Sequence, residues 1–312
     1  MPQRKPAPPA PGPIGAIEAG GTKFMLALAA PDGSLLETTR LPTLTPQETM
    51  PQVVEFFRAA AARHGALCGM GVASFGPIEI DPRSPAYGTI THTPKPGWSG
   101  MRFADWLAPL GVPITVDTDV NGAALGESLA GAGQGCGTVA YTTVGTGIGT
   151  GVVTAGRPLA GFTHFESGHI RVPHDRTADP FDGICPYHGD CLEGLACGPA
   201  IAARFGASFE ELADPAAAVA LIAGYLADLA ANLVLLHAPD RLIFGGGVMK
   251  APGMLEALRA GTEQRLAGYA SGPAGEPGLV RYVVTPALGD LAGITGAVEL
   301  GRLSVAQSVT PA

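Results

Sequence analysis

Three glycine-rich runs in this chain have the composition of phosphate-binding loops. They are Gly20-Gly21-Thr22-Lys23, Gly145-Thr146-Gly147 and Gly245-Gly246-Gly247. Glycine leaves the backbone N–H groups unobstructed, the first two runs add a hydroxyl, and Lys23 adds a positive charge. None matches the GxxxxGK[ST] loop, and each run alone also suits an ordinary turn. Because all three follow apolar strands, together they predict a site for an ATP-sized nucleotide at the carboxyl ends of those strands.

Two carboxylates stand where a strand gives way to a helix. Asp117 and Asp119 lie in the run Asp-Thr-Asp-Val-Asn, directly after an apolar strand. An aspartate at this position often caps a helix. It could equally accept the proton of a hydroxyl that attacks a phosphoryl group. The spacing does not choose between Asp117 and Asp119 for that role.

A cluster of histidine and cysteine has the spacing of a metal site. Cys185, His188 and Cys191 form a Cys-x2-His-x2-Cys run, and His169 lies 16 residues before its first cysteine. Two thiolates and two imidazoles are a ligand set of closed tetrahedral zinc sites. The alternative is a polar surface loop with incidental thiols. We expect structural Zn²⁺ here, held by His169, Cys185, His188 and Cys191.

The elements that position these residues occur in two similar sets. Each set begins with a strand, a turn of glycine and threonine, and a returning strand, about 125 residues apart, which predicts a duplicated α/β lobe. In the first set we expect strands at 14–19, 24–29, 35–40, 68–75 and 114–118, with helices at 46–64, 101–110 and 121–132. In the second we expect strands at 137–144, 150–154 and 241–244, and a helix at about 216–236 preceded by Asp214 as its cap.

Composition narrows the class of protein. The formal charge of −8 argues against a nucleic-acid or anionic-membrane partner. Five cysteines in 312 residues argue against a secreted disulfide scaffold and for a cytoplasmic protein, with Cys68, Cys136 and Cys197 as inert core thiols. The proline-rich segment 1–13 predicts a disordered lead, and the apolar stretch at 216–236 predicts a helix of a soluble protein because Asp228 and Asn232 interrupt it.

These motifs, in this order, resemble the ROK family of sugar kinases and, within it, the bacterial fructokinase branch. The resemblance rests on Glu18 through Lys23, Asp119, Glu166-x-Gly168-His169, the Cys185–Cys191 run with Glu193, and the last glycine run. Thr93-Pro94-Lys95-Pro96-Gly97-Trp98 also matches that branch. The resemblance to the family covers nearly the whole chain after Pro13.

The resemblance implies a fold, an activity and site residues. The fold is an α/β actin-like ATPase fold with two ribonuclease H-like lobes around a nucleotide and sugar cleft. The activity is transfer of the γ-phosphate of ATP to the 6-hydroxyl of a hexose, most simply D-fructose, with Mg²⁺. Asp119 aligns with the general base and also contacts the sugar. The glycine runs align with the ATP site, and Glu166, His169 and Glu193 align with ligands of sugar hydroxyls.

Three positions depart from the wider family pattern. Glu18 replaces an aspartate before the first loop, as in the fructokinase branch, and keeps a carboxylate that can act through Mg²⁺. His188 replaces a cysteine, and either residue binds zinc. Thr118 replaces an asparagine before the base, so Thr118 takes the place of one sugar contact.

The resemblance also implies a homodimer and a division of the chain. We expect one lobe at 14–118, joined by a C-terminal helix at about 292–306, and a second at 119–291 that carries the zinc loop. The alternatives are a glucokinase or mannokinase of the same family, or a sugar-binding regulator without catalysis. A sugar-sensing repressor would need a DNA-binding domain before residue 14.

Overall fold

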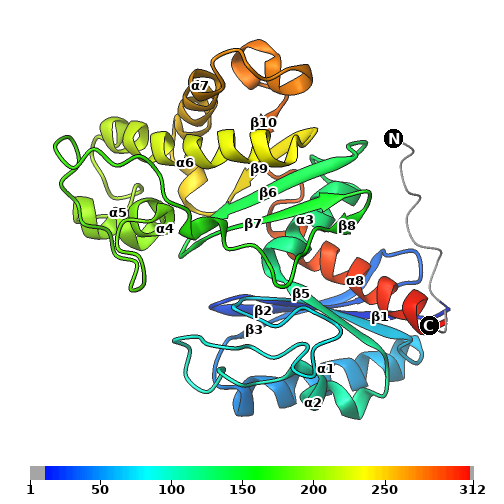
Figure 1. Ribbon diagram of the computed structural model, residues 1–312. Helices are drawn as coiled ribbons and strands as arrows, with labels where there is room; N and C mark the ends of the chain where they lie inside the picture. Colours follow the sequence, from blue (N-terminus) through cyan, green and yellow to red (C-terminus); the bar gives the residue numbers. More distant parts are fainter. Residues whose placement is uncertain (1–10, 310–312) are drawn as a thin grey trace. The chain divides into compact units, whose positions relative to one another are not determined.

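The computed structural model describes residues 11–309, shown in Figure 1. Residues 1–10 of the predicted disordered lead lie outside the described residues. By its internal contacts the described chain divides into two compact units. Of the described residues, the first contains 11–130, 156–164 and 290–309, and the second contains 131–155 and 165–289.

Each unit contains both strands and helices. The strands are β1 (Ile14–Ala19), β2 (Lys23–Ala29), β3 (Leu35–Pro42), β4 (Gly69–Ser74), β5 (Ile114–Thr118), β6 (Thr138–Val144), β7 (Ile148–Thr154), β8 (Arg157–Pro158), β9 (Arg241–Gly245) and β10 (Val283–Val284). The helices are α1 (Pro46–His64), α2 (Phe103–Leu107), α3 (Asp119–Ala130), α4 (Leu192–Ala196), α5 (Gly198–Phe205), α6 (Ala216–His237), α7 (Met254–Leu266) and α8 (Ala292–Val309).

The two sheets repeat one strand order. The first sheet has the strand order β3-β2-β1-β4-β5, and the second, read in the same direction, has the order β8-β7-β6-β9-β10. Strand β6 therefore corresponds to β1, β7 to β2 and β9 to β4. In each sheet the two hairpin strands are antiparallel, β1 with β2 and β6 with β7. The strand on the other side is parallel, β4 beside β1 and β9 beside β6. The predicted duplication is therefore confirmed. It puts the turns after β1 and β6 at equivalent positions.

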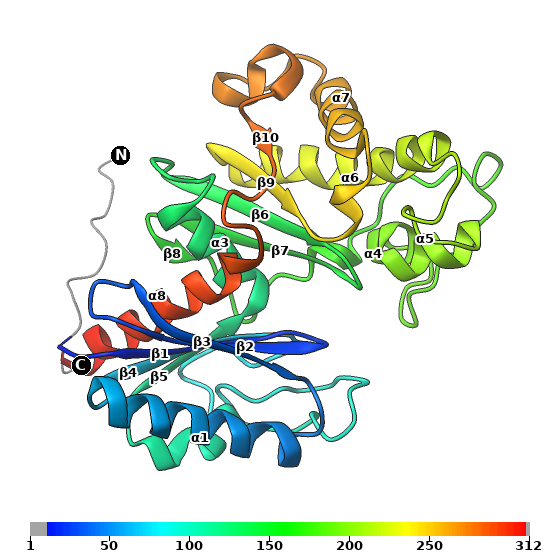
Figure 2. The ribbon, with the colours of Figure 1, turned by 180° about the vertical axis from the view of Figure 1, so that it is seen from behind.

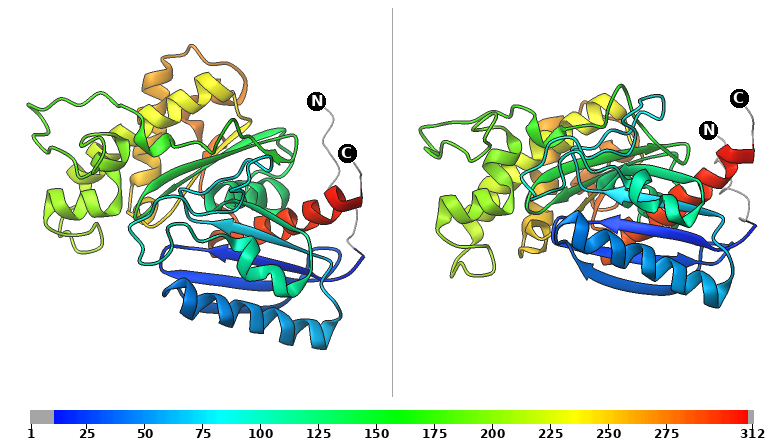
Figure 3. Two further views of the ribbon diagram at one scale, coloured as in Figure 1. Left: turned by 60° about the horizontal axis from the view of Figure 1, so that its bottom comes forward. Right: turned by 90° about the horizontal axis from the view of Figure 1, so that it is seen from below.

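The core of the first unit lies between its sheet and α1. Phe24, Met50, Phe57, Met70 and Trp98 are each at most 1% exposed there. Figure 3, in which α1 is blue and α8 is red, shows the two helices on opposite faces of the sheet. The start of α1 forms a capping box, in which the Glu48 carboxylate accepts a hydrogen bond from the Thr45 N–H.

Helices α3 and α8 approach each other through glycines. A Cβ on Gly296 would lie 1.7 Å from the carbonyl oxygen of Gly122, and one on Gly126 would lie 2.2 Å from that of Ala292. Side chains larger than hydrogen would separate the helices. This contact places α3 with the first unit, so the compact units divide after residue 130, whereas the division predicted from the sequence falls after Thr118.

The second unit packs helices against its own sheet. Figure 2 shows α6 and α7 together beside β9, with α4 and α5 beyond them. Within the described residues, α6 is the one helix long and apolar enough to cross a membrane, yet 61% of its most apolar window is buried. A largely buried apolar helix is what a core helix of this length looks like, so this finding is weak evidence for a membrane span.

Several predicted elements differ from the structure at their ends; β7, for example, begins at Ile148 rather than at residue 150, and β3 ends at Pro42 rather than at residue 40. Three helices differ as follows. The helix predicted at 101–110 ends at Leu107 and continues as a 3₁₀ turn, Ala108–Leu110, because Pro109 lacks the N–H that an α-helix needs. The helix predicted from Asn121 begins at Asp119. Helix α6 is capped at Pro215 rather than Asp214, whose carboxylate accepts a hydrogen bond from the Ala216 N–H at 3.2 Å.

Candidate functional site

In the first unit, the register of the sheet brings the first glycine loop and Asp119 to one edge. Ala19 pairs with Ser74 in the parallel strands β1 and β4, and Ser74 pairs with Thr118 in β4 and β5. The carboxyl ends of the three strands therefore lie side by side. The loop Gly20–Lys23 leaves one of these ends, and Asp119 follows another as the first residue of α3.

Two carboxylates at this edge influence each other. Burial, followed by the charge of Asp119, raises the pKa of Glu18 from 4.5 to about 7. A Cβ on Gly293, in the first turn of α8, would lie 2.5 Å from the Glu18 carboxyl group, so the glycine is what admits that side chain. A buried carboxyl next to a second carboxylate is stabilised by a cation, and oxygen donors are what Mg²⁺ prefers. Glu18 therefore fits the predicted role of a carboxylate that acts through Mg²⁺.

Asp117 differs from Asp119 in its surroundings. Its carboxylate accepts hydrogen bonds from the Asn121 side-chain amide at 2.6 Å and from the Thr118 N–H at 2.7 Å. Burial raises the pKa of Asp117 to about 6. Asp117 thus binds the first turn of α3, where it holds the helix, while Asp119 accepts a hydrogen bond from the Val120 N–H at 2.9 Å.

The first loop is closed by its own backbone and flanked by charge. The Gly20 N–H donates to the Lys23 carbonyl at 3.0 Å, and the Thr43 hydroxyl donates to the Gly20 carbonyl at 2.8 Å. The Asp290 carboxylate lies 3.7 Å from the Lys23 ammonium and 3.9 Å from the Arg40 guanidinium. The sequence reasoning missed Asp290, because its contact with the loop spans most of the chain.

In the second unit, the other two glycine loops lie together at one end of the sheet. Thr143 pairs with Gly245 in the parallel strands β6 and β9. Gly246 has a positive φ of 93°, and a Cβ there would lie 2.2 Å from the Val144 carbonyl oxygen. A side chain would therefore be excluded twice, by conformation and by space. Gly247 faces open space, which leaves its backbone accessible.

Glu193 joins the second glycine loop to the histidine–cysteine cluster. Its Oε2 accepts a hydrogen bond from the Ile148 N–H at 2.9 Å, and its Oε1 lies 4.0 Å from Nε2 of His169. The other ring nitrogen of His169, Nδ1, lies 3.5 Å from Sγ of Cys191 and 3.7 Å from Sγ of Cys185. His169 thus presents one nitrogen to the thiols and the other to a carboxylate.

The four residues predicted to bind zinc come together. Donor atoms of His169, Cys185, His188 and Cys191 all lie within 4.8 Å of one another. The cysteines are buried and unpaired with each other as a disulfide. Burial raises the pKa of Cys191 to about 11, and a cation among the four donors would favour its thiolate instead. The donor set therefore fits one tetrahedral Zn²⁺.

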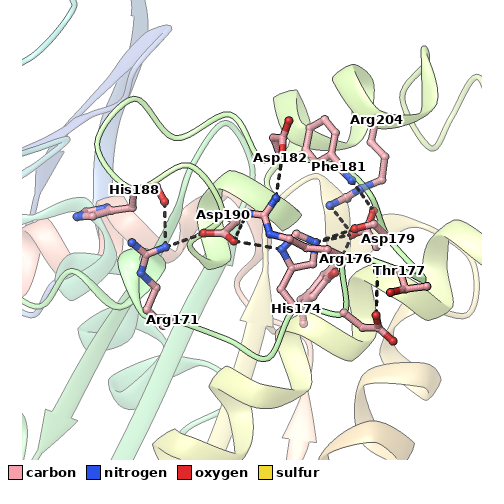
Figure 4. A network of polar contacts seen from close by, with 12 residues as sticks. Arg171, His174, Arg176, Thr177, Asp179, Phe181, Asp182, His188, Asp190 and Arg204 are labelled. Carbon is pink, nitrogen blue, oxygen red and sulfur yellow. Dashed lines mark hydrogen bonds and ion pairs between the residues drawn. The ribbon is translucent and has the colours of Figure 1, made fainter.

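The loop that carries this cluster is also held by a network of ion pairs (Figure 4). The Asp190 carboxylate lies 2.7 Å from Arg171, 2.7 Å from Arg176 and 3.3 Å from Nδ1 of His174. Hydrogen bonds from His174 and Arg176 hold the pKa of Asp190 below its usual range. Because Asp190 directly precedes Cys191, the network fixes one end of the cluster. Sequence reasoning missed it, since the participating residues follow no local pattern.

Glu166 lies in the same turn as His169 but in a different environment. The His169 N–H donates to the Glu166 carbonyl at 3.0 Å; Glu166 directly precedes the 3₁₀ turn Ser167–His169, and His169 ends it. The Glu166 side chain lines a pocket of about 440 Å³ together with residues of β7 and α6.

The prediction of inert core thiols is correct in part. Cys197 is buried, but Cys68 and Cys136 are half-buried, so they are wrong as core positions. Cys68 precedes β4, and Cys136 lies in the turn before β6, where the chain reaches the surface of its unit. Burial still raises the pKa of all three thiols, which favours their protonated form.

Comparison with known proteins agrees with this arrangement. The ROK family model matches residues 14–302. The chain is 45% identical over 297 residues to the fructokinase of Zymomonas mobilis, covering 92% of this chain and 95% of that one. It is 40% identical over 290 residues to a putative fructokinase of Bacillus subtilis, covering 93% and 95%.

A solved structure is similar over the same range. The ROK hexokinase of Thermus thermophilus superposes with a TM-score of 0.78 and 28% identity, covering 95% of this chain and 99% of that one. The predicted actin-like ATPase fold is confirmed by this likeness and by the two mixed sheets of one strand order. On the match of its sequence from residue 14 to residue 302, the chain belongs to the ROK family.

Proposed function

We propose that this protein is a fructokinase, which transfers the γ-phosphate of MgATP to the 6-hydroxyl of D-fructose. The observation that carries this proposal is the 45% identity to a fructokinase over nearly the full length of both chains. The site residues described above are compatible with that chemistry, since each of them has the donor, acceptor or charge that its role requires.

Asp119 is the proposed general base. It starts α3 at the carboxyl end of β5, whereas the Asp117 carboxylate is bound by the Asn121 side-chain amide at 2.6 Å. It accepts the proton of the 6-hydroxyl as the oxygen attacks the γ-phosphorus, and ADP leaves with the bridging oxygen. Thr118 beside it is the proposed sugar contact in place of the family's asparagine.

The glycine loops are the proposed ATP site. The backbone of Gly20, Gly21, Thr22 and Lys23 and the loop Gly145-Thr146-Gly147 face the phosphates, and Gly245–Gly247 faces the adenosine. Mg²⁺, held near Glu18 and Asp119, would neutralise the charge of the β- and γ-phosphates. The support for this reading is that each loop stands at the carboxyl end of a parallel strand and that Gly246 admits no side chain.

The proposed sugar ligands of the second unit are Glu166, His169 and Glu193. Zn²⁺ bound to Nδ1 of His169 and to Cys185, His188 and Cys191 would fix the loop on which His169 lies. Nε2 of His169 then stays available to a sugar hydroxyl, beside the Glu193 carboxylate at 4.0 Å. The metal is structural in this proposal and takes no part in the transfer. A homodimer remains a prediction from the family resemblance.

The test is a substrate panel. ADP release is measured with MgATP and each of D-fructose, D-glucose, D-mannose and N-acetylmannosamine, on protein whose zinc content has been determined. A kcat/KM for fructose at least about 10-fold above the others supports the proposal, since a pocket that pairs with a specific hydroxyl discriminates by that much or more. A preference for glucose or mannose would change the assigned substrate and leave the proposed mechanism unchanged. Absence of turnover with every sugar would contradict the kinase assignment.

A further inference from the structure

One segment of the first unit has no role in the proposed mechanism, although it is distinctive in sequence. This segment, Thr93–Trp98, contains a lysine between two prolines. Its last residue, Trp98, is buried in the core of the first unit. The Trp98 indole is 1% exposed, lies against the rings of Phe24 and Phe75, and donates from Nε1 to the Leu44 carbonyl at 2.7 Å. The end of the segment is therefore fixed to the core beneath the first glycine loop.

The backbone between Thr93 and Trp98 is held in one conformation. The Thr93 N–H donates to the Ser99 hydroxyl at 3.0 Å, and that hydroxyl donates to the Thr93 carbonyl at 3.1 Å. Gly97 has a φ of 79°, which favours glycine. Pro94 and Pro96 fix φ on both sides of Lys95. The Lys95 side chain therefore leaves the segment from a rigid base.

That side chain reaches the first glycine loop. Nζ of Lys95 donates a hydrogen bond to the carbonyl of Gly21 and lies 5.3 Å from the centroid of the Phe75 ring. These partners are neutral. Lys23 and Arg40, by contrast, both face the carboxylate of Asp290. Lys95 thus brings a full positive charge to the loop, and its ammonium group has two further N–H donors beyond the one that Gly21 accepts.

We propose that Lys95 binds the phosphoryl group that is transferred. This inference rests on the proposed function, because it takes the first glycine loop as the site of the ATP phosphates. The bond from the sugar oxygen to the γ-phosphorus forms as the bond to the β,γ-bridging oxygen breaks, and the hydroxyl proton goes to Asp119. Lys95 gives up no proton. Its charge neutralises the equatorial oxygens of the phosphoryl group, which carry the negative charge in the transition state.

The rival explanation is that Lys95 is a structural tie between the segment and Gly21. A neutral donor could serve that purpose as well as an ammonium group. Lys95→Gln separates the two explanations, because the glutamine amide can still donate to the Gly21 carbonyl but carries no charge. Lys95→Arg keeps the charge. Arg83→Gln is the matched control, since Arg83 is an exposed cation in the loop preceding the same segment and pairs with Asp81.

Two measurements on the full-length protein test the proposal. In steady-state kinetics with fructose, we expect Lys95→Gln to lower kcat/KM for MgATP by about 100-fold, Lys95→Arg by less than about 10-fold, and Arg83→Gln by less than about 2-fold. In equilibrium binding with Mg²⁺ present, we expect Lys95→Gln to weaken the β,γ-imido analogue of ATP about 10-fold and to leave AMP unchanged.

The outcomes separate the proposal from its rival and from the proposed function. A Lys95→Gln variant with wild-type kinetics overturns the role of Lys95, and so does an equal loss of affinity for AMP and the triphosphate analogue. A loss confined to KM for fructose also overturns it. If the wild-type protein phosphorylates no sugar, the proposed function fails. The binding measurements then still decide whether Lys95 contacts the terminal phosphate.

Discussion

Glu193 accepts a hydrogen bond from the backbone N–H of Ile148 at 2.9 Å. Ile148 is the first residue of β7, directly after the loop Gly145–Gly147, so a proposed sugar ligand is bound to a proposed phosphate loop. A Cβ on Gly147 would lie 2.7 Å from the same carboxylate oxygen, and only glycine allows this approach. The hydrogen bond links the two substrate sites within the second unit.

Glu193→Ala is therefore expected to impair both substrates. The buried Ile148 N–H loses its acceptor, and an unsatisfied buried donor costs about 1–3 kcal/mol. We expect KM for fructose and KM for MgATP each to rise by at least about 10-fold. The measurement is two-substrate steady-state kinetics, with the exposed Glu210→Ala as the control. An unchanged KM for MgATP would show that the hydrogen bond between Glu193 and Ile148 does not contribute to ATP binding.

Asp119→Asn is expected to abolish transfer while fructose still binds. Asparagine keeps the size of the side chain and cannot accept the proton, so kcat should fall by about 10²- to 10⁴-fold. The affinity for fructose, measured by calorimetry, should change by only a few-fold. Asp105→Asn is the control, because Asp105 is exposed on α2 and lies 3.8 Å from Arg102. Retention of more than a tenth of the kcat by Asp119→Asn would exclude Asp119 as the base.

Glu18→Gln is expected to stabilise the protein at high pH. The pKa of Glu18 is raised in the folded state from 4.5 to about 7, so between these values the folded protein binds more protons than the unfolded chain. The contribution of Glu18 to the free energy of unfolding therefore falls as pH rises from about 4.5 to 7, by about 3 kcal/mol in total. Glutamine removes this loss.

The measurement for Glu18→Gln is urea unfolding in magnesium-free buffer. At pH 8 the variant should be more stable than wild type by up to about 3 kcal/mol, and at pH 4 the two should be equal. Glu211→Gln, which removes a carboxylate whose pKa is lowered by hydrogen bonds from Ser208, should give no gain at pH 8. The same Glu18→Gln variant should lose kinase activity if Glu18 acts through Mg²⁺. A gain at pH 8 that persists at pH 4 would contradict the titration of Glu18.

The cysteines of the cluster are expected to be required for zinc. The purified protein should contain about one zinc per chain, and Cys185→Ser or Cys191→Ser should lose it. Loss of zinc should lower the thermal midpoint by several degrees and weaken fructose binding, because Nδ1 of His169 would lose its partner. Cys136→Ser is the control, since Cys136 lies outside the cluster. Metal analysis and calorimetry are sufficient, and full retention of zinc by both cluster variants would refute the site.

The local elements could be predicted from the sequence because their signals are local. Strands β1 and β5 and helix α1 occupy the predicted residues, since apolar periodicity and the Thr45–Glu48 capping box act over a few positions. The duplicated hairpins, the order of motifs and the Cys-x2-His-x2-Cys run are likewise visible in the chain. They sufficed to predict the fold, the family and the members of the metal cluster.

The tertiary structure alone decided which distant residues meet. Lys95 contacts Gly21 across 74 positions and Glu193 contacts Ile148 across 45, and no periodicity encodes either pair. The family resemblance points to Asp119 as the base, and the structure adds that the Asp117 carboxylate is already bound by the Asn121 amide. Local sequence sets backbone conformation and which face is apolar. The packing of helices and sheets then sets the long-range contacts, and with them burial, charge and the direction in which a side chain points.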